Sequence, residues 1–151
     1  MNTSNQTPDY KSVLESDGVL AQLPLGTSML PMLKQKRDTV VIEKLTRRPK
    51  VNDVVLYQRK NKKYVLHRII KVKGNSYVIR GDNCFYSEYD ITENDIIGIL
   101  SGFYKDEKYI DCSKNILYKI YVFVWRSTYY LRYFLRKTHV LLAKIKHIIF
   151  K

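Results

Sequence analysis

The sequence predicts a mainly β protein, in which a compact antiparallel β-domain is followed by an amphipathic helical tail. Short β-branched runs bounded by turn residues recur through the first 112 residues. From Asn115 onward the apolar residues recur at helical spacing instead. Charge changes at the same place, because nine basic residues and no acidic one follow Asp111 in a chain of net charge +13. We therefore divide the chain into an N-terminal segment (1–17), a β-domain (18–112) and a basic tail (113–151).

The composition is that of a globular protein. With 151 residues, 45% hydrophobic and 27% charged, the chain is long enough for one domain with a core and an appendage. Its two cysteines, Cys84 and Cys112, are too few for a disulfide framework and lack metal-type spacing. We therefore expect free thiols, with one disulfide as the alternative, and no metal or cofactor. No signal-peptide pattern and no apolar run of about 18 residues is visible, so neither a signal peptide nor a standard membrane span is predicted.

The expected elements follow one another with short turns between them. A helix over 9–17 is closed by Gly18. Strands are expected over 19–25, 38–44, 53–59, 63–72, 77–80, 96–105 and 108–111, the last pairing with the one before it. A meander of short strands with little helix indicates antiparallel pairing.

The tail has two chemically different faces. At about 100° per residue its apolar residues share one sector and most basic residues lie opposite, with a bend or break expected near Thr138. A membrane surface or the β-domain itself would bury the apolar sector, whereas nucleic acid would leave it in water. We expect residues 114–151 to hold the protein peripherally at an anionic membrane surface, with nucleic acid disfavoured as a partner. The side of the membrane, cytoplasmic or opposite, stays open.

A serine lies in an irregular stretch, "GTSMLPML" at 26–33. Pro31 removes a backbone donor and biases Leu30 away from helix, while Gly26 permits a sharp turn, so Ser28 follows an extended run directly. Most turn serines are only polar caps, and a serine becomes a nucleophile when a base takes its proton.

Only one of the three histidines lies in the β-domain. His67 is in the longest expected strand, on the same side as Val65 and Ile69. A histidine on an apolar strand face is either a core residue or, with a serine nearby, a general base. The motifs around it decide between these two interpretations.

Three motifs in this order resemble the signal peptidase family of serine peptidases. They are Gly26-Thr27-Ser28-Met29-Leu30-Pro31, His67-Arg68 and Gly81-Asp82-Asn83, followed by Ile97-Gly98, and they cover residues 18 to 102. The resemblance implies a β-domain of the signal peptidase/LexA-like type, with Ser28 as nucleophile and His67 as base, as in the family's histidine branch. It also implies a peptide or preprotein substrate, extended along a strand edge and cleaved after a small residue.

The residue that assists His67 has three candidates. A histidine base usually needs a third group that fixes its tautomer and stabilises the imidazolium. Asp82 is the aspartate of the family's motif, although it equally suits a cap of its own turn. Asp90 is the alternative, which matches the family's second acidic position loosely, and Glu88 is the weakest of the three.

The same resemblance implies the substrate-binding groups. The backbone N–H of Ser28 would donate to the oxyanion, with Met29 and Pro31 in the same box. Some family members carry a hydroxyl two residues before the nucleophile, where this chain has Gly26, so Thr27 is the nearest substitute.

Two rival interpretations remain. Self-cleaving repressors share the fold but cut an upstream Ala-Gly or Cys-Gly bond, and this chain contains neither dipeptide. The second rival interpretation is a non-catalytic cationic protein that binds a membrane or nucleic acid through its tail. Typical signal peptidases are anchored by an N-terminal membrane span and act on the far side of the membrane. This sequence shows no such span, so a leader peptidase on the cytoplasmic face is a further alternative.

Overall fold

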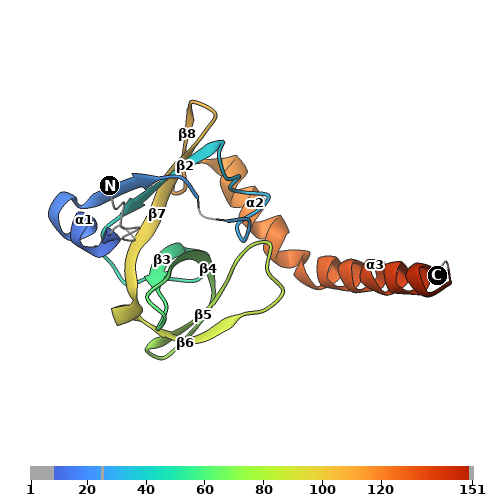
Figure 1. Ribbon diagram of the computed structural model, residues 1–151. Coiled ribbons are helices and arrows are strands. Elements are labelled where there is room, and N and C mark those ends of the chain that lie inside the picture. Colours follow the sequence, from blue (N-terminus) through green and yellow to red (C-terminus); the bar gives the residue numbers. More distant parts are fainter. Residues whose placement is uncertain (1–8, 25, 150–151) are drawn as a thin grey trace, which may run out of the picture. The chain divides into compact units, whose positions relative to one another are not determined.

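The computed structural model describes residues 9–24 and 26–149, with side chains at 143–147 and 149 left undescribed (Figure 1). The chain forms two compact units, of which the first ends at Asn115 and the second begins at Ile116. The first helix, which we assigned to a separate N-terminal segment, packs on the β-domain. Its residue Leu14 is 1% exposed, and a Cβ at Gly98 of a central strand would lie 3.0 Å from Leu14 Cδ1.

The first unit contains one short helix, a single 3-10 turn and eight strands among the residues described. In chain order they are α1 (Tyr10–Asp17), β1 (Val19–Gln22), β2 (Asp38–Glu43), β3 (Val54–Gln58), β4 (Tyr64–Lys73), β5 (Ser76–Arg80), β6 (Glu88–Thr92), η1 (Glu93–Asp95), β7 (Ile96–Lys105) and β8 (Lys108–Asp111). The expected helix and every expected strand are confirmed, with bounds shifted by at most a few residues. Strand β6 is new. Its sequence, EYDIT, alternates polar and apolar residues over only five positions and was not singled out in the sequence analysis.

The strands form one antiparallel sheet in the order β1-β2-β7-β3-β4-β5-β6, with β8 also paired to β7. Register shifts interrupt the pairing of β2, β3, β4 and β5 with their neighbours. Such irregularities bend strands and increase their twist, which lets the sheet close over its own core. The mainly antiparallel β architecture is therefore confirmed.

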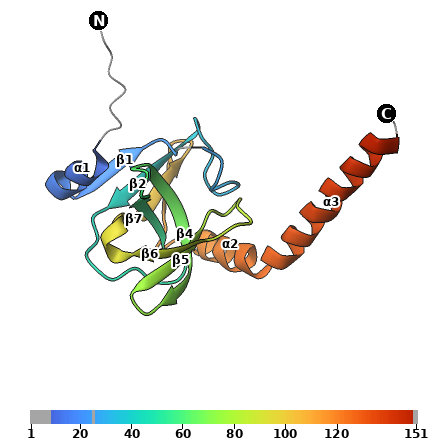
Figure 2. The same cartoon turned by 60° about the horizontal axis from the view of Figure 1, so that its bottom comes forward.

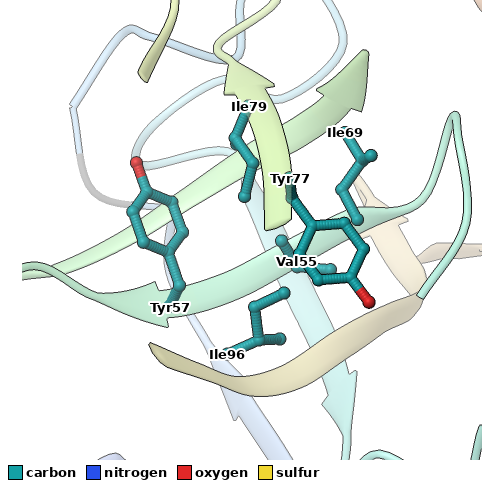
Figure 3. Packing of buried hydrophobic residues seen from close by; sticks show 6 residues of the cluster. All are labelled: Val55, Tyr57, Ile69, Tyr77, Ile79 and Ile96. Atoms are coloured by element: carbon teal, nitrogen blue, oxygen red, sulfur yellow. The ribbon is translucent and has the colours of Figure 1, made fainter. Parts of the chain in front are cut away.

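The core lies among the central strands. Figure 3 shows side chains from β3, β4, β5 and β7 that point toward one another and are at most 5% exposed: Val55, Tyr57, Ile69, Tyr77, Ile79 and Ile96. In β3 four consecutive residues are buried, so both faces of this strand are covered. The strand beside it, β4, carries His67 into the same interior at 2% exposure.

The second unit consists of two helices, α2 (Ile116–Ser127) and α3 (Tyr129–Ile149), which follow one another along the chain (Figure 2). The break falls at Thr128 rather than near Thr138, which lies within α3, and this corrects the sequence-based expectation. Thr128 Oγ1 donates to the Val124 carbonyl at 2.8 Å, and the Arg132 guanidinium stacks 3.7 Å from the Trp125 ring centroid across the break. Neither of these described helices is long and apolar enough to cross a bilayer.

Candidate active site

Ser28 lies in a turn that is held by buried side chains on its C-terminal side. Met29, Met32 and Leu33 are 4%, 6% and 1% exposed, whereas Ser28 itself is half-buried. Gly26 has a φ of +75°, the left-handed conformation that glycine adopts without strain, and the Leu30–Pro31 peptide is cis. The turn is thus anchored to the core while its serine faces outward enough to meet a substrate.

The Ser28 turn docks on the Gly81-Asp82-Asn83 turn, which follows β5. The Asn83 backbone N–H donates to the Ser28 carbonyl at 2.8 Å, and Asn83 Nδ2 donates to the Thr27 carbonyl at 3.2 Å. Two motifs that lie more than fifty residues apart in the sequence are therefore joined directly.

The Ser28 turn and the His67 ring both lie against Gly81. A Cβ on Gly81 would lie 2.7 Å from the Ser28 carbonyl oxygen and 2.9 Å from both His67 Nε2 and Cys84 Sγ. Any residue other than glycine at position 81 would therefore clash with these groups. Among the described hydrogen bonds none joins Ser28 Oγ to His67 Nε2, and such contacts tighten in many enzymes only when substrate is bound.

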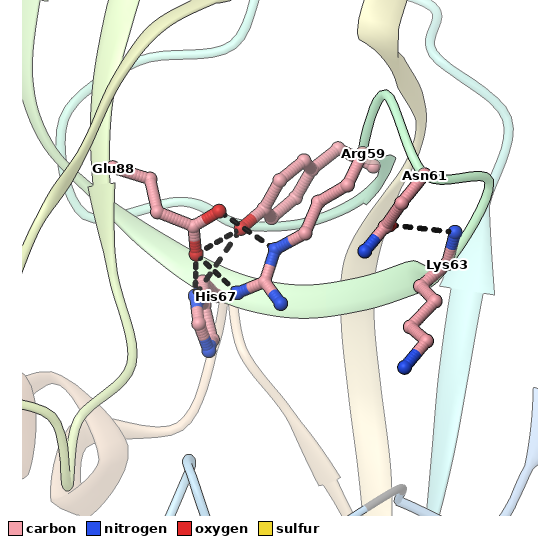
Figure 4. A network of polar contacts seen from close by, with 6 residues as sticks. Arg59, Asn61, Lys63, His67 and Glu88 are labelled. Atoms are coloured by element: carbon pink, nitrogen blue, oxygen red, sulfur yellow. Dashed lines mark hydrogen bonds and ion pairs between the residues drawn. The ribbon is translucent and has the colours of Figure 1, made fainter.

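Glu88, from β6, contacts the other nitrogen of the His67 ring. Its Oε1 lies 3.2 Å from Nδ1, and Tyr57 donates its hydroxyl to the same oxygen at 2.6 Å. Arg59 holds the carboxylate with two hydrogen bonds of 2.7 and 2.6 Å (Figure 4). A carboxylate can only accept, so this network places the proton of the neutral His67 ring on Nδ1. Nε2, on the side of Ser28, is then free to accept a hydrogen bond.

The electrostatics of the group suit a neutral base beside an ionised acid. Burial lowers the pKa of His67 below the ordinary value of 6.5, and the Glu88 charge restores only part of the loss. Burial acts to raise the pKa of Glu88, but hydrogen bonds from Arg59 and Tyr57 outweigh it, so the pKa of Glu88 falls below its usual value. Near neutral pH the site therefore holds a neutral imidazole and a carboxylate.

Asp82 has a different main partner from the one we expected. Its carboxylate accepts from Arg68 Nε at 2.8 Å and from Arg68 Nη2 at 2.7 Å, and both side chains are buried. Arg68 also donates to the Asn52 carbonyl at 2.9 Å. Asp82, our first candidate for the group on His67, is thus ion-paired with Arg68, and in the described ion pairs the carboxylate at His67 Nδ1 is that of Glu88.

The remaining candidates lie around these groups. Asp90 is exposed on β6, at a φ of 58°. Thr27 and Pro31 are exposed on the Ser28 turn, whereas Met29 is buried beneath it. No described residue accepts a hydrogen bond from the Ser28 backbone N–H, which suits the role of oxyanion donor.

Tyr57 and Arg59 are the members of the site that the sequence analysis did not single out. Tyr57 lies on β3, the strand paired with β4, where Val55 is opposite His67 and Tyr57 is opposite Val65, and Arg59 follows the end of β3. Within the described ranges no three His, Cys, Asp or Glu side chains are arranged to bind a metal ion. Cys84 and Cys112 are not joined by a disulfide.

Gly81→Ala is expected to reduce any activity of this site strongly with a modest loss of stability. The new methyl group clashes with the Ser28 carbonyl, the His67 ring and the Cys84 thiol together, so the Ser28 turn and His67 cannot both keep their places. Misplacement by about 1 Å costs on the order of 100-fold in rate. Turnover and thermal unfolding of the same preparation measure both effects. Gly74→Ala is the control, because it meets no atom within 4 Å yet lies at φ +55°, so it costs stability without touching the site. Equal activity in both variants would contradict the convergence at Gly81.

No known family model and no curated protein matches the chain. An interpretation of this site therefore rests on its sequence motifs and on its geometry. The geometry comprises a serine in a fixed turn, the buried imidazole of His67, and a carboxylate at His67 Nδ1.

Proposed function

We propose that this protein is a serine endopeptidase of the signal peptidase type, in which Ser28 is the nucleophile and His67 the base. The observation that carries the proposal is the meeting of the Ser28 turn and His67 Nε2 at Gly81, with the Glu88 carboxylate on His67 Nδ1. A nucleophile, a base and a group that orients the base are the three parts that acyl transfer requires.

The chemistry follows from this order. Ser28 Oγ attacks the carbonyl carbon of the scissile peptide bond, and its proton passes to His67 Nε2. Glu88 stabilises the imidazolium through the Nδ1–H, and the Ser28 backbone N–H donates to the oxyanion. The imidazolium then protonates the leaving amine, and a water activated by His67 hydrolyses the acyl-enzyme.

Open strand edges beside the site support a peptide as the substrate. β1, which leads toward the Ser28 turn, is at one end of the strand order and pairs only with β2 among the described strands. In β4 the stretch Tyr64–His67 pairs with β3, whereas pairing with β5 begins at Arg68. Backbone edges that pair with no further strand among the described residues suit an extended chain that adds as a strand. By the motif resemblance, cleavage would follow a small residue.

The test is a comparison of protein N-termini in source cells that carry the wild-type protein or Ser28→Ala. A defined set of cleaved N-termini is expected to vanish in Ser28→Ala and also in His67→Ala, because each removes one half of the proton transfer. Ser16→Ala is the control, since Ser16 is exposed on α1, away from this site. If all N-termini persist while both variants are present at wild-type levels, the peptidase assignment is wrong and the cationic tail becomes the candidate for function.

A further inference from the structure

The described side chains of α3 divide between an apolar face and a basic face. Seven apolar side chains share one sector of the helix and are 55% to 80% exposed: Tyr130, Leu131, Phe134, Leu135, Leu141, Leu142 and Ile148. Arg132, Arg136 and His139 lie on the opposite side, and Lys137 lies at the edge of the apolar sector. So many exposed large apolar residues on one helix face mark an interaction surface.

Helix α2 repeats the arrangement over a shorter length. One sector carries five apolar side chains that are 48% to 76% exposed: Ile116, Leu117, Ile120, Phe123 and Val124. Lys119 and Arg126 lie outside this sector. Two basic side chains make cation–π contacts in this unit. The Arg132 guanidinium lies 3.7 Å from the Trp125 ring centroid, and Lys137 Nζ lies 4.8 Å from the Tyr133 ring centroid. Both helices therefore combine an exposed apolar sector with basic residues outside it.

The distribution of charge in the tail favours one of three possible partners for this surface. Residues 112–151 carry nine basic residues and no acidic one, so a second copy of the tail would bring like charges together without any counter-charge. A nucleic acid would neutralise the basic residues but leave twelve exposed apolar side chains in water. An anionic lipid surface satisfies both faces, because acyl chains receive the apolar sector and headgroups lie at the level of the cations.

We infer that α2 and α3 bind the surface of an anionic lipid bilayer, lying in its interface with the apolar sectors toward the acyl chains. This surface is separate from the Ser28 site, and the inference does not depend on the peptidase activity. If both proposals hold, the tail brings the site to substrates at the membrane.

The experiment measures binding of the full-length protein carrying Ser28→Ala to vesicles, by flotation. Vesicles of phosphatidylcholine with about one third phosphatidylglycerol are compared with phosphatidylcholine alone. Binding is expected only to the anionic vesicles and to weaken as salt is raised, because salt screens the charges. Since catalysis is absent from this variant, the result is independent of the peptidase test.

Two sets of variants separate the contribution of apolar area from that of positive charge. Phe134→Ser with Leu141→Ser removes apolar area and is expected to lower vesicle affinity by more than about 100-fold. Val140→Ser is the matched control, because Val140 is 47% exposed but lies on the basic side of α3. Arg136→Gln with Lys137→Gln is expected to lower affinity by roughly 10- to 30-fold.

Three results would overturn the inference. The first is equal binding to neutral and anionic vesicles, or none to either. The second is self-association in lipid-free buffer, seen by sedimentation equilibrium, that Phe134→Ser with Leu141→Ser abolishes; a second copy would then cover the apolar face. The third is tight binding of a single- or double-stranded oligonucleotide that excludes vesicles.

Discussion

Replacing Glu88 with glutamine is expected to lower kcat for peptide cleavage by about 10³- to 10⁴-fold, with little change in KM. The glutamine amide can donate an N–H to His67 Nδ1, which moves the ring proton to Nε2, the nitrogen on the side of Ser28. In that tautomer the imidazole cannot accept the serine proton. The variant also lacks the charge that stabilises the imidazolium. Steady-state kinetics on a peptide identified by N-terminal comparison measures the effect.

The pH dependence of the same variant gives an independent readout. Because burial lowers the pKa of His67, the acidic limb of kcat/KM in the wild-type protein is expected below pH 6.5. Glu88 raises this pKa, so its neutralisation must lower it further and shift the limb to still lower pH. Glu93→Gln, an exposed neutralisation on η1, should leave kcat and the limb unchanged. An unshifted limb in Glu88→Gln would show that Glu88 does not act on His67.

Asp82→Asn is expected to lower the free energy of unfolding by about 3–5 kcal/mol. The Arg68 and Asp82 side chains are 2% and 4% exposed, so the variant leaves a buried guanidinium without its carboxylate. For a domain of this size such a loss lowers Tm by at least about 10 °C. Thermal and denaturant unfolding of the purified protein measure it.

The control for this variant is Asp90→Asn. Asp90 is exposed and has a φ of 58°, a conformation that asparagine adopts as readily as aspartate, so a change within about 0.5 kcal/mol is expected. If Asp82→Asn instead keeps full stability but loses kcat and shifts the acidic limb, Asp82 rather than Glu88 orients His67. The two variants thus separate a group that holds the turn from one that acts on the base.

Part of the Glu88 network was readable from the sequence. The polar connection Lys60–Lys62 predicts a hairpin between two strands, and its register places Val55 opposite His67 and Tyr57 opposite Val65. Residues directly opposite in an antiparallel pair share a face, so Tyr57 necessarily points to the side of His67. The signal was present in the strand alternation, although nothing in it marks the tyrosine as functional.

Glu88 itself could not be placed in this way. It begins β6, a strand of mixed polar sequence, and reaches the site after an irregular connection of residues 81–87. Its pairing with β5 also contains a register shift between Tyr77 and Ile79. A shift of one residue turns each side chain to the other face, so local sequence does not decide which acidic residue meets the histidine.

Features that depend on neighbours along the chain could be predicted from the amino-acid sequence. These are the positions of most strands along the chain, the turn that carries Ser28, and the basic tail with its two faces, because alternation, turn residues and helical spacing act within a few residues. Which side chains bind one another depends on the folded arrangement of distant segments. His67 and Arg68 are adjacent on β4 and point to opposite faces, so Asp82 could bind only one of them closely. Which one it binds depends on how the 81–83 turn lies over the folded sheet, and that is set by contacts between distant segments.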